Sequence, residues 1–405
     1  MITVTQANKW LKPVNIYWIL GFLIIGYGIF ALNGYGNDDD TYRMLNTWKT
    51  LISEGRYVPS RFQGNLIPEL SIGLASEIGG FYLANFVSVV LSVSSLFIFY
   101  ALLLGVTTSL IAALSVLAIA SNPFWIIAST TSMDYVYGAF FFILGLFLLI
   151  KKKPRWAGVL FAASVCSRLT YGPMGAIAFL LYLPYVRENL KLRNSLIQGF
   201  LVFLVTTGVF YLPVFFASGM SLSFLAVGPD ASGGFIGIIA RFIYKNVYFW
   251  GLPAFVLLVI FFIQDKSIYQ KIATNPFQKV RVKKLLFHGA LWCIIYNEIM
   301  FFKLPHEYAY LLPLLFSVAY LIATSDRVKK TRYLSFLIGL QLLYGLIFNL
   351  DVLQTYQKDP VAKTIHSDSA KIHVSIKEGV LIRELDWRST YQAYQLGEFN
   401  KKWHQ

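Results

Sequence analysis

Three adjacent carboxylates, Asp38, Asp39 and Asp40, follow the first long apolar stretch of the chain. Like charges at neighbouring positions repel one another, so holding them together where the chain leaves a membrane costs free energy. A carboxylate within hydrogen-bond reach of a hydroxyl can act as a general base, and carboxylates also bind divalent cations. The sequence therefore predicts an active site at this point.

Other ionisable residues fall at the ends of apolar stretches that would emerge on the same side. They are Arg61, Glu69, Asp134, Arg168, Arg241, Lys245, His306 and Glu307. Each also has a purely structural interpretation: Asp134 could cap the helix that follows it, and Arg168 could bond free backbone carbonyls. Ionisable groups at membrane-helix ends are nevertheless functional candidates, and Arg and Lys bind phosphate. Their convergence on one face favours transfer of a sugar from a lipid phosphate.

The composition identifies the kind of chain that must position these residues. Of 405 residues, 57% are hydrophobic and 14% are charged, whereas soluble domains carry roughly a quarter charged residues. The expected fold class is an all-α polytopic membrane protein. The net charge of +15 does not indicate nucleic-acid binding, because the basic residues lie in short loops where they set orientation. The two Cys lie in apolar segments and the five His lack metal-ligand spacing, so no disulfide framework or zinc site is expected.

About 11 membrane-spanning helices are expected, within a range of about 9 to 13, because a span needs about 20 apolar residues. The candidates are residues 13–33, 81–104, 107–127, 134–150, 156–168, 171–186, 196–217, 246–264, 286–302, 308–324 and 333–350. Arg168 and Gly172-Pro173 interrupt the stretch 156–186, which predicts two short helices that meet at Arg168.

Lys and Arg gather in every second loop, for example at Lys151–Arg155 and Lys279–Lys284. This pattern predicts a cytoplasmic N-terminus, a retained first helix and an extracytoplasmic acidic triplet. The location expected is the inner (plasma) membrane of a bacterium. The expected parts are a transmembrane catalytic domain (1–350) with a first outer loop (34–80) and a second outer loop that could act as a lid (218–245), then a small extracytoplasmic tail (351–405).

Two segments outside the membrane have regular patterns. Thr41–Glu54 places Leu45, Trp48, Leu51 and Ile52 on one face, and Gly55 follows as a stop signal, which predicts an amphipathic helix in the membrane interface. Apolar and polar residues alternate within Lys371–Ile382, which predicts a small hairpin in the tail.

Five stretches resemble, in order and in sidedness, motifs of the GT-C superfamily of integral-membrane glycosyltransferases. They are Asp39–Tyr42, Tyr57–Glu69, Ser132–Tyr135, Ser167–Tyr171 and Leu304–Pro313. The resemblance covers about residues 1–325 and is to the protein O-mannosyltransferase-like (family 39-type) and aminoarabinose-transferase-like families. It implies an enzyme that uses a polyprenyl-phosphate sugar donor, inverts the sugar carbon and glycosylates an extracytoplasmic glycan, lipid or protein.

The same resemblance implies roles for individual residues. Asp39 is expected to be the general base, with Asp38 and Asp40 as alternatives, and Asp134 is expected to orient the acceptor or, with Asp39, to bind a metal. Arg61, Arg168, Arg241, Lys245 and His306 are candidates for the donor phosphate. The remaining expected substrate contacts are Tyr42, Glu69, Tyr171 and Glu307. No cofactor is required by the sequence, and a divalent metal (Mg²⁺ or Mn²⁺) is left open.

The principal alternative is a transporter or flippase of a lipid-linked glycan or a small anion. That class predicts substrate-binding charges near the bilayer midplane and inverted repeats, and the sequence shows neither. Asp38-x-Asp40 also matches the Asp-x-Asp pattern of cytosolic sugar-nucleotide enzymes. Those enzymes need a soluble α/β domain, and the tail of about 55 residues is the longest non-membrane stretch.

Overall fold

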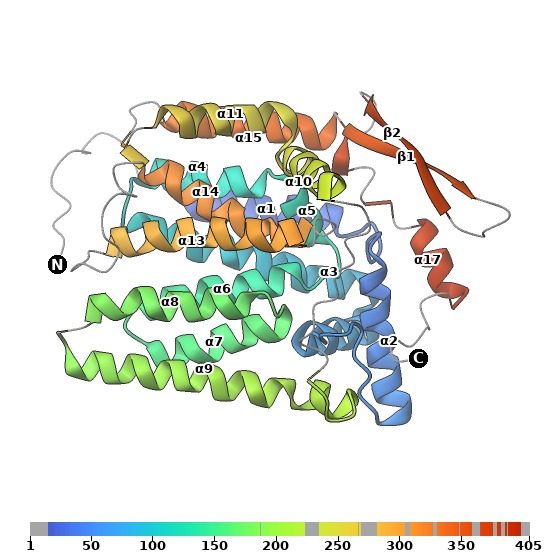
Figure 1. Cartoon of the computed structure of the whole chain (residues 1–405), viewed down its shortest axis with the longest axis horizontal. Helices are drawn as coiled ribbons and strands as arrows, with labels where there is room; N and C mark the ends of the chain where they lie inside the picture. The colour runs from blue at the N-terminus through green and yellow to red at the C-terminus, as the bar shows by residue number, and fades with distance from the viewer. Residues whose placement is uncertain are drawn as a thin grey trace.

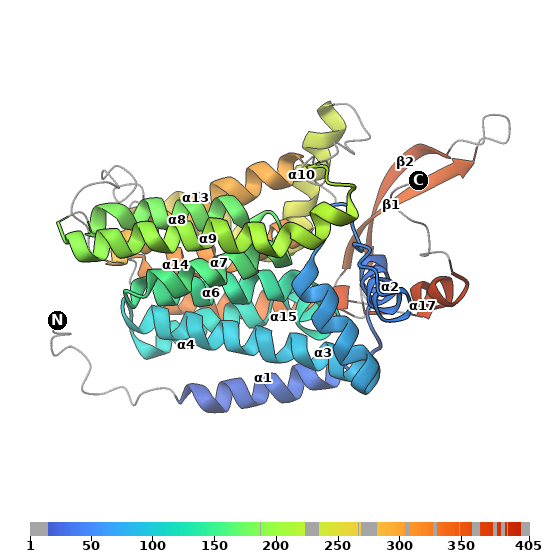
Figure 2. The ribbon, with the colours of Figure 1, turned by 90° about the horizontal axis from the view of Figure 1, so that it is seen from below.

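The computed structural model describes residues 15–186, 188–222, 235–265, 267–268, 282–303, 308–326, 330–347, 349–358, 365–375, 379–381, 385–386 and 388–397. Most of its helices run side by side along one direction and form a bundle (Figures 1 and 2). In chain order they are α1 (Ile16–Phe30), α2 (Asp39–Glu54), α3 (Leu66–Leu104), α4 (Ser109–Ala120), α5 (Pro123–Thr130), α6 (Tyr135–Ile150), α7 (Pro154–Ser167), α8 (Tyr171–Val186), α9 (Leu190–Ala217), α10 (Phe235–Trp250), α11 (Leu252–Gln264), α13 (Val282–Lys303), the 3₁₀ turn η2 (Tyr308–Tyr310), α14 (Leu312–Thr324), α15 (Lys330–Leu346) and α17 (Arg388–Gln395).

The bundle has the surface of an integral membrane protein. Large apolar side chains point outward, including Trp18 and Phe22 on α1 and Val205 on α9, as a lipid environment requires. Within the described residues, α3, α9 and α13 are long and apolar enough to cross a membrane, and counting each of two bent helix pairs as one span gives up to five. The expected total of about 11 spans therefore stays a prediction.

Helix breaks occur where the sequence supplies a backbone that can turn. The pair α4 and α5 bends by 72° around Asn122, and α10 and α11 bend by 97° at Gly251, whose φ is +77°. The expected single helices 107–127 and 246–264 are thus wrong as straight spans. Helix α3 begins at Leu66 rather than residue 81 and is kinked at Gly79 and Gly80, so the outer segment 34–80 contains α2 and the first turns of α3.

The two short helices expected around Arg168 are confirmed as α7 and α8. Arg168 has extended backbone angles, and its carbonyl accepts a hydrogen bond from the amide of Tyr171 at 3.0 Å. The backbones of helices α7 and α9 are in contact at Gly158 and Gly199. A Cβ on Gly158 would lie 2.2 Å from the carbonyl oxygen of Gly199, so only glycine permits this approach. This close packing fixes α7, and with it the position of Arg168 at its end.

The segment expected to form an amphipathic helix is helical, as α2, whereas the expected position in the membrane interface stays a prediction. It lies across one end of the bundle, where the hairpin and α17 also gather (Figures 1 and 2). Gly55 ends it in the left-handed conformation at φ +65°. Its buried face carries Tyr42, Met44 and Leu45, whereas Ile52 is exposed.

A two-stranded antiparallel sheet adds a small β element to the all-α expectation. Strand β1 (Asn349–Lys358) pairs with β2 (Ile365–Ser375) in a register that joins Asn349 to Ser375 and Lys358 to Ile365. The hairpin expected in the tail is therefore present, although the alternating segment Lys371–Ile382 coincides only with the end of β2. Alternation identified only the end of β2, because the side-chain pattern of a strand does not say which neighbouring segment supplies its hydrogen-bond partner.

Candidate active site

The acidic triplet forms the start of α2, and its three carboxylates have different partners. Asp38 is the N-cap, and its Oδ1 accepts a hydrogen bond from the amide of Asp40 at 3.1 Å. Asp39 and Asp40 form the first turn, where the helix dipole favours negative charge. The start of a helix therefore stabilises all three negative charges.

Two of the three carboxylates are held by arginines. Asp39 Oδ2 receives Arg43 Nη2 at 2.9 Å, one helical turn along, and the Asp39 side chain is 47% exposed. Asp40 contacts Arg61 Nη1 at 3.1 Å and is 17% exposed. Asp38 instead accepts a hydrogen bond from the hydroxyl of Tyr135 at 2.9 Å.

Asp134 connects the triplet to the broken helix. Its fully buried carboxylate lies 3.0 Å from Arg61 Nη2 and 3.2 Å from Arg168 Nη1. The side-chain amide of Asn65 donates a third bond to it at 3.0 Å. Residues separated by more than a hundred positions thus form one network, as their shared sidedness predicted.

Glu69 supports the loop that carries Arg61. It is completely buried on the first turn of α3, and its Oε1 accepts hydrogen bonds from the amide of Ser60 at 2.9 Å and the amide of Asn65 at 3.2 Å. The hydroxyls of Ser60 and Tyr57 also donate to this carboxylate. The described hydrogen-bond partners of the Glu69 carboxylate are therefore all residues of the 57–65 loop, which also carries Arg61.

A cleft of about 450 Å³ opens beside the acidic triplet. Asn37, Asp38 and Asp39 line it on one side, and Phe124, Tyr135 and Tyr308 give it an aromatic wall. Asp40 is not among the described lining residues. Of the three carboxylates, Asp38 and Asp39 are thus the ones that line this cleft among the described residues.

Asp38 has the electrostatic character that a base at neutral pH requires. Burial raises the pKa of its carboxyl from 3.8 to about 6, and Asp39 adds to the rise by repulsion. The amide of Asp40, the positive charge of Arg61 and the hydroxyl of Tyr135 act in the opposite direction. A group with a pKa near the working pH is the most effective proton acceptor.

Arg168 lies behind the aromatic wall. Its guanidinium is 4.7 Å from the ring centre of Tyr135 and 5.5 Å from that of Tyr310, both within the range of cation–π contact. Tyr135 in turn lines the cleft and donates to Asp38. The ring of Tyr135 therefore lies between the positive charge of Arg168 and the cleft.

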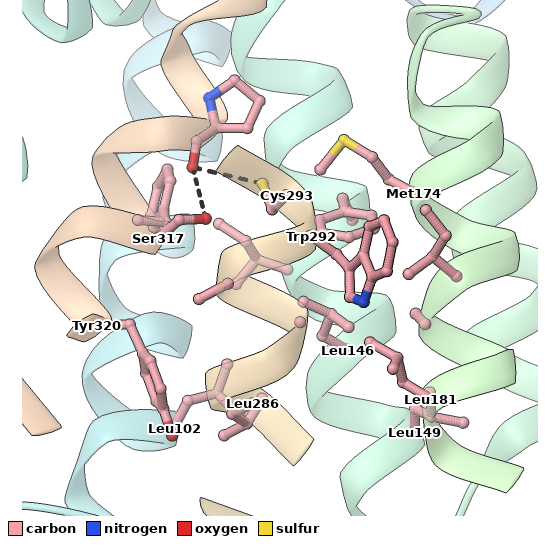
Figure 3. A pocket seen from close by; sticks show the side chains of 18 of the residues that line it. Leu102, Leu146, Leu149, Met174, Leu181, Leu286, Trp292, Cys293, Ser317 and Tyr320 are labelled. Carbon is pink, nitrogen blue, oxygen red and sulfur yellow. Dashed lines mark hydrogen bonds between the residues drawn. The ribbon is translucent and has the colours of Figure 1, made fainter. Parts of the chain in front are cut away.

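An apolar pocket of about 120 Å³ runs between α3, α6, α8, α13 and α14. Tyr171 lines it, and Leu149, Leu286 and Tyr320 lie at the lower end of the view in Figure 3. Figure 3 shows Trp292, Leu146 and Leu181 facing the same space from three helices. Apart from Tyr171, Cys293, Ser317 and Tyr320, little that lines it is polar.

The remaining predicted residues are placed as follows. Tyr42 is buried in α2, and its hydroxyl donates to the carbonyl of Gly36 at 3.0 Å. Lys245 on α10 has its Nζ 4.1 Å from the ring centre of Tyr308, which lines the cleft. Arg241 lies one turn earlier on α10 and is not among the described cleft residues. His306 and Glu307 lie outside the described residues.

The contacts of each carboxylate indicate which of them could bind a metal ion. Asp38, Asp39 and Asp40 can bring one oxygen each within 4.8 Å of one another, a spacing that suits a hard cation. Asp134 fits less well, because both of its oxygens already contact arginine. A metal held by Asp39 and Asp134 together would have to displace at least one of these arginines.

Several residues of the site carried no assigned role in the sequence. Arg43 could have been identified, because it follows Asp39 by four residues and Asp40 by three on a predicted helix. Asn65, Tyr135 and Tyr308 are near the motifs, but their polar contacts are made across the fold. Thr390 lines the cleft from the tail, and no feature of the sequence indicated a role for it.

No family model matches the sequence, and no curated protein matches it. The structure is similar to ArnT from Cupriavidus metallidurans bound to undecaprenyl phosphate, with a TM-score of 0.55 and 13% identity over 76% of this chain and 60% of that chain. Apo ArnT from the same organism aligns with a TM-score of 0.54 and 14% identity, over 76% and 59%. Archaeal oligosaccharyltransferase AglB from Archaeoglobus fulgidus, in complex with an inhibitory peptide and a dolichol-phosphate, aligns with a TM-score of 0.37 and 15% identity over 82% and 50%, too low to support an argument.

The likeness to ArnT establishes the class of fold. The chain has the surface of an integral membrane protein and a fold similar to that of ArnT. It spans about 60% of the length of the ArnT chain that it matches. At 13% identity the likeness concerns the fold, so activity and substrates must be argued from the site.

Proposed function

We propose that this protein is a glycosyltransferase that moves a sugar from a polyprenyl-phosphate donor to a hydroxyl of an extracytoplasmic acceptor. The acceptor classes consistent with the fold are a glycan, a lipid or a protein. Transfer inverts the sugar carbon, as in other GT-C enzymes. The N-terminus is cytoplasmic, the cleft opens on the extracytoplasmic side, and the membrane is the bacterial inner membrane.

One observation carries this proposal: Arg168 contacts one residue that lines the apolar pocket and one residue that lines the acidic cleft. Tyr171 lines the pocket, and its amide bonds the carbonyl of Arg168 at 3.0 Å. Tyr135 lines the cleft and stacks on the guanidinium of Arg168. A polyprenyl-phosphate sugar has the same three parts in the same order, namely an apolar chain, an anionic phosphate and a polar sugar.

The reaction uses these parts as follows. The acceptor hydroxyl oxygen attacks the sugar carbon, and the bond between that carbon and the phosphate oxygen breaks. The electron pair of the broken bond leaves with the polyprenyl phosphate, whose charge Arg168 and Lys245 stabilise. A carboxylate in the cleft takes the proton of the acceptor hydroxyl.

The geometry favours Asp38 over Asp39 as that general base. Both carboxylates line the cleft, but Asp39 is paired with Arg43 at 2.9 Å, and an adjacent positive charge weakens a base. Asp38 makes neutral hydrogen bonds to Tyr135 and the amide of Asp40. Asp39 then serves to bind the acceptor.

The other residues position these groups. Asp134 holds Arg61 and Arg168, and Glu69 holds the loop of Arg61. Tyr42 fixes the turn before the triplet through Gly36. Arg241 is proposed as a weaker donor contact, since it lies one turn from Lys245 on α10.

The test is release of polyprenyl phosphate by the purified full chain in nanodiscs, given a panel of polyprenyl-phosphate sugars and a crude envelope extract as acceptor. Asp38→Asn is expected to lower the rate by about 10²–10⁴-fold and Asp39→Asn by less. Glu54→Gln, on the exposed end of α2, is the matched control and is expected to leave the rate unchanged. Running each sample with and without a chelator decides whether the triplet works with a divalent metal.

A different result would favour the transporter class. If no donor in the panel releases polyprenyl phosphate while vesicles show saturable flux of a lipid-linked glycan, the transferase proposal is wrong. Equal rates for Asp38→Asn and Glu54→Gln would retain the enzyme class but remove Asp38 as the base.

A further inference from the structure

Helix α17 of the C-terminal tail forms part of the cleft, although it lies more than 350 residues from the acidic triplet in sequence. Thr390 lines the cleft together with Asn37, Asp38 and Asp39. Its hydroxyl oxygen lies 3.1 Å from the carbonyl oxygen of Asn37 and also contacts the Asn37 side chain. Asn37 directly precedes Asp38, so this contact lies beside the proposed base.

Aromatic contacts attach α17 to α2. The rings of Tyr391 and Tyr394 lie 6.3 and 5.1 Å from that of Tyr42, and Lys49 Nζ lies 4.7 Å above the ring of Tyr394. None of the residues of α17 is buried. The helix is therefore a surface wall of the cleft rather than part of its core, and a substrate can meet its inner side.

The outer end of the cleft offers groups that suit a neutral polar ligand. Asn37 supplies an amide and Thr390 a hydroxyl, each able to donate and to accept a hydrogen bond. Two carboxylates, Asp38 and Asp39, stand beside them, and none of the described cleft-lining residues is Lys or Arg. Asp38 would repel an anionic group placed here at short range, and Asp39 would add to this repulsion, less strongly because Arg43 offsets its charge.

The presence of a general base also favours a neutral acceptor. A phosphate monoester is already ionised near neutral pH, since its second pKa is about 6, and it attacks without giving up a proton. A hydroxyl has a proton to lose, and Asp38 in its half-buried position is suited to take it. The aromatic rings of Phe124 and Tyr308, 4.5 Å apart between centres, add a platform for a sugar ring.

We infer that Asn37, Asp39 and Thr390 form an acceptor subsite, and that it takes the uncharged hydroxyls of a carbohydrate rather than a phosphate-bearing acceptor. This inference rests on the proposed function. Thr390 is its specificity-determining residue, because it is the described cleft-lining residue that α17 contributes and its hydroxyl contacts Asn37, directly before Asp38.

The experiment measures sugar binding without any donor, so its result does not depend on turnover. Saturation-transfer NMR on the full chain in nanodiscs is used with short neutral hexose oligosaccharides and with the same sugars carrying one phosphate monoester. The neutral sugars are expected to bind saturably and more tightly than their phosphorylated forms. Asp39→Asn is expected to reduce this difference.

The role of Thr390 is tested with three variants. Thr390→Val keeps the shape but removes the hydroxyl, and is expected to weaken neutral-sugar binding about fivefold, the effect of one hydrogen bond. Thr390→Ser keeps the hydroxyl and is expected to bind like the wild type. Ser389→Ala, at an exposed neighbouring position, is the control and is expected to change nothing.

Three outcomes would overturn the inference. They are phosphorylated sugars that bind as tightly as neutral ones, a Thr390→Ser variant as weak as Thr390→Val, and an absence of saturable neutral-sugar binding. Because polyprenyl-phosphate release is measured separately, saturable sugar binding without release would count against the proposed transferase alone.

Discussion

The guanidinium of Arg168 and the carboxylate of Asp134 form an ion pair inside the protein. Arg168 Nη1 lies 3.2 Å from Oδ1 and 3.4 Å from Oδ2, and Asp134 is completely buried. Arg61 contacts the same carboxylate at 3.0 Å. Asp134 thus contacts two arginines at once, one in the first outer loop, which also pairs with Asp40, and one at the junction of α7 and α8.

Asp134→Asn is expected to destabilise the fold strongly, because it removes the charge of the carboxylate that pairs with the buried Arg168 and of one of the two carboxylates that pair with Arg61. Removing one partner of a buried pair costs about 3–5 kcal/mol. Thermal unfolding of the detergent-solubilised chain, followed by intrinsic fluorescence, measures the change. Glu54→Gln breaks an exposed pair with Arg56 and is expected to cost less than about 1 kcal/mol. Equal unfolding temperatures for the two variants would contradict the structural role of Asp134.

Glu69→Gln is expected to loosen the loop that carries Arg61. The carboxylate accepts bonds from Ser60, Asn65 and Tyr57, and a glutamine would turn an NH₂ group toward some of these donors. The expected loss is about 1–3 kcal/mol, accompanied by a lower rate of donor cleavage. Glu77→Gln, on the same helix at an exposed position, is the control and is expected to keep both stability and rate.

The rate is expected to fall as the pH drops through about 6. Burial raises the pKa of Asp38 to about 6, and only its deprotonated form can accept the proton of the acceptor. Tyr135→Phe removes a hydrogen bond that lowers this pKa while keeping the ring that stacks on Arg168, so the acid limb of the pH profile should move upward. A limb that stays in place would show that another group limits the rate.

The same pKa has a consequence for folding. Between about pH 4 and pH 6 the folded chain binds the Asp38 proton more tightly than the unfolded chain does, so the contribution of Asp38 to stability declines as the pH rises through this window. Asp38→Asn is expected to flatten this part of the stability profile. Denaturation midpoints across the window measure it.

Gly289→Leu is expected to weaken long-chain donors selectively. Gly289 lines the apolar pocket, and the nearest atom to a Cβ there is Leu181 Cδ1 at 4.0 Å, so a side chain fits but occupies pocket space. Excluding about two methylene groups of the lipid chain costs roughly tenfold in affinity. Fluorescence quenching of Trp292 on titration with short- and long-chain polyprenyl phosphates measures the effect.

Gly208→Leu is the matched control for this pocket. Gly208 lies on the exposed side of α9, a Cβ added to it would meet nothing within 4 Å, and it does not line the pocket. It is expected to leave both affinities unchanged. A similar loss for both glycine variants, or equal losses for short and long chains, would place the lipid chain elsewhere.

Much of the site could be predicted because its residues follow local rules. The helix over Thr41–Glu54, its stop at Gly55 and the break at Arg168 all depend on nearest neighbours, and the structure confirms each. The shared sidedness of Arg61, Asp134 and Arg168 follows from counting apolar stretches. Their meeting at 3.0 and 3.2 Å is confirmed by the structure.

Other features could not be predicted, because they depend on packing between distant segments. The bends at Asn122 and Gly251 occur inside continuous apolar stretches, where hydropathy indicates a straight span. The partner of β2 is β1 rather than the segment after it. Glu69 has the sequence pattern of an exposed loop acid but is completely buried beneath that loop.

The sequence by itself determined that this chain is a membrane protein and that a helix over Thr41–Glu54, ended by Gly55, follows the acidic triplet. Only the tertiary structure decided which carboxylate faces the cleft, which is paired with arginine, and that Thr390 closes one side. The reason is physical: hydropathy and helix capping act over a few residues. The environment of a charge is set by whatever the folded chain brings within a few ångströms of it.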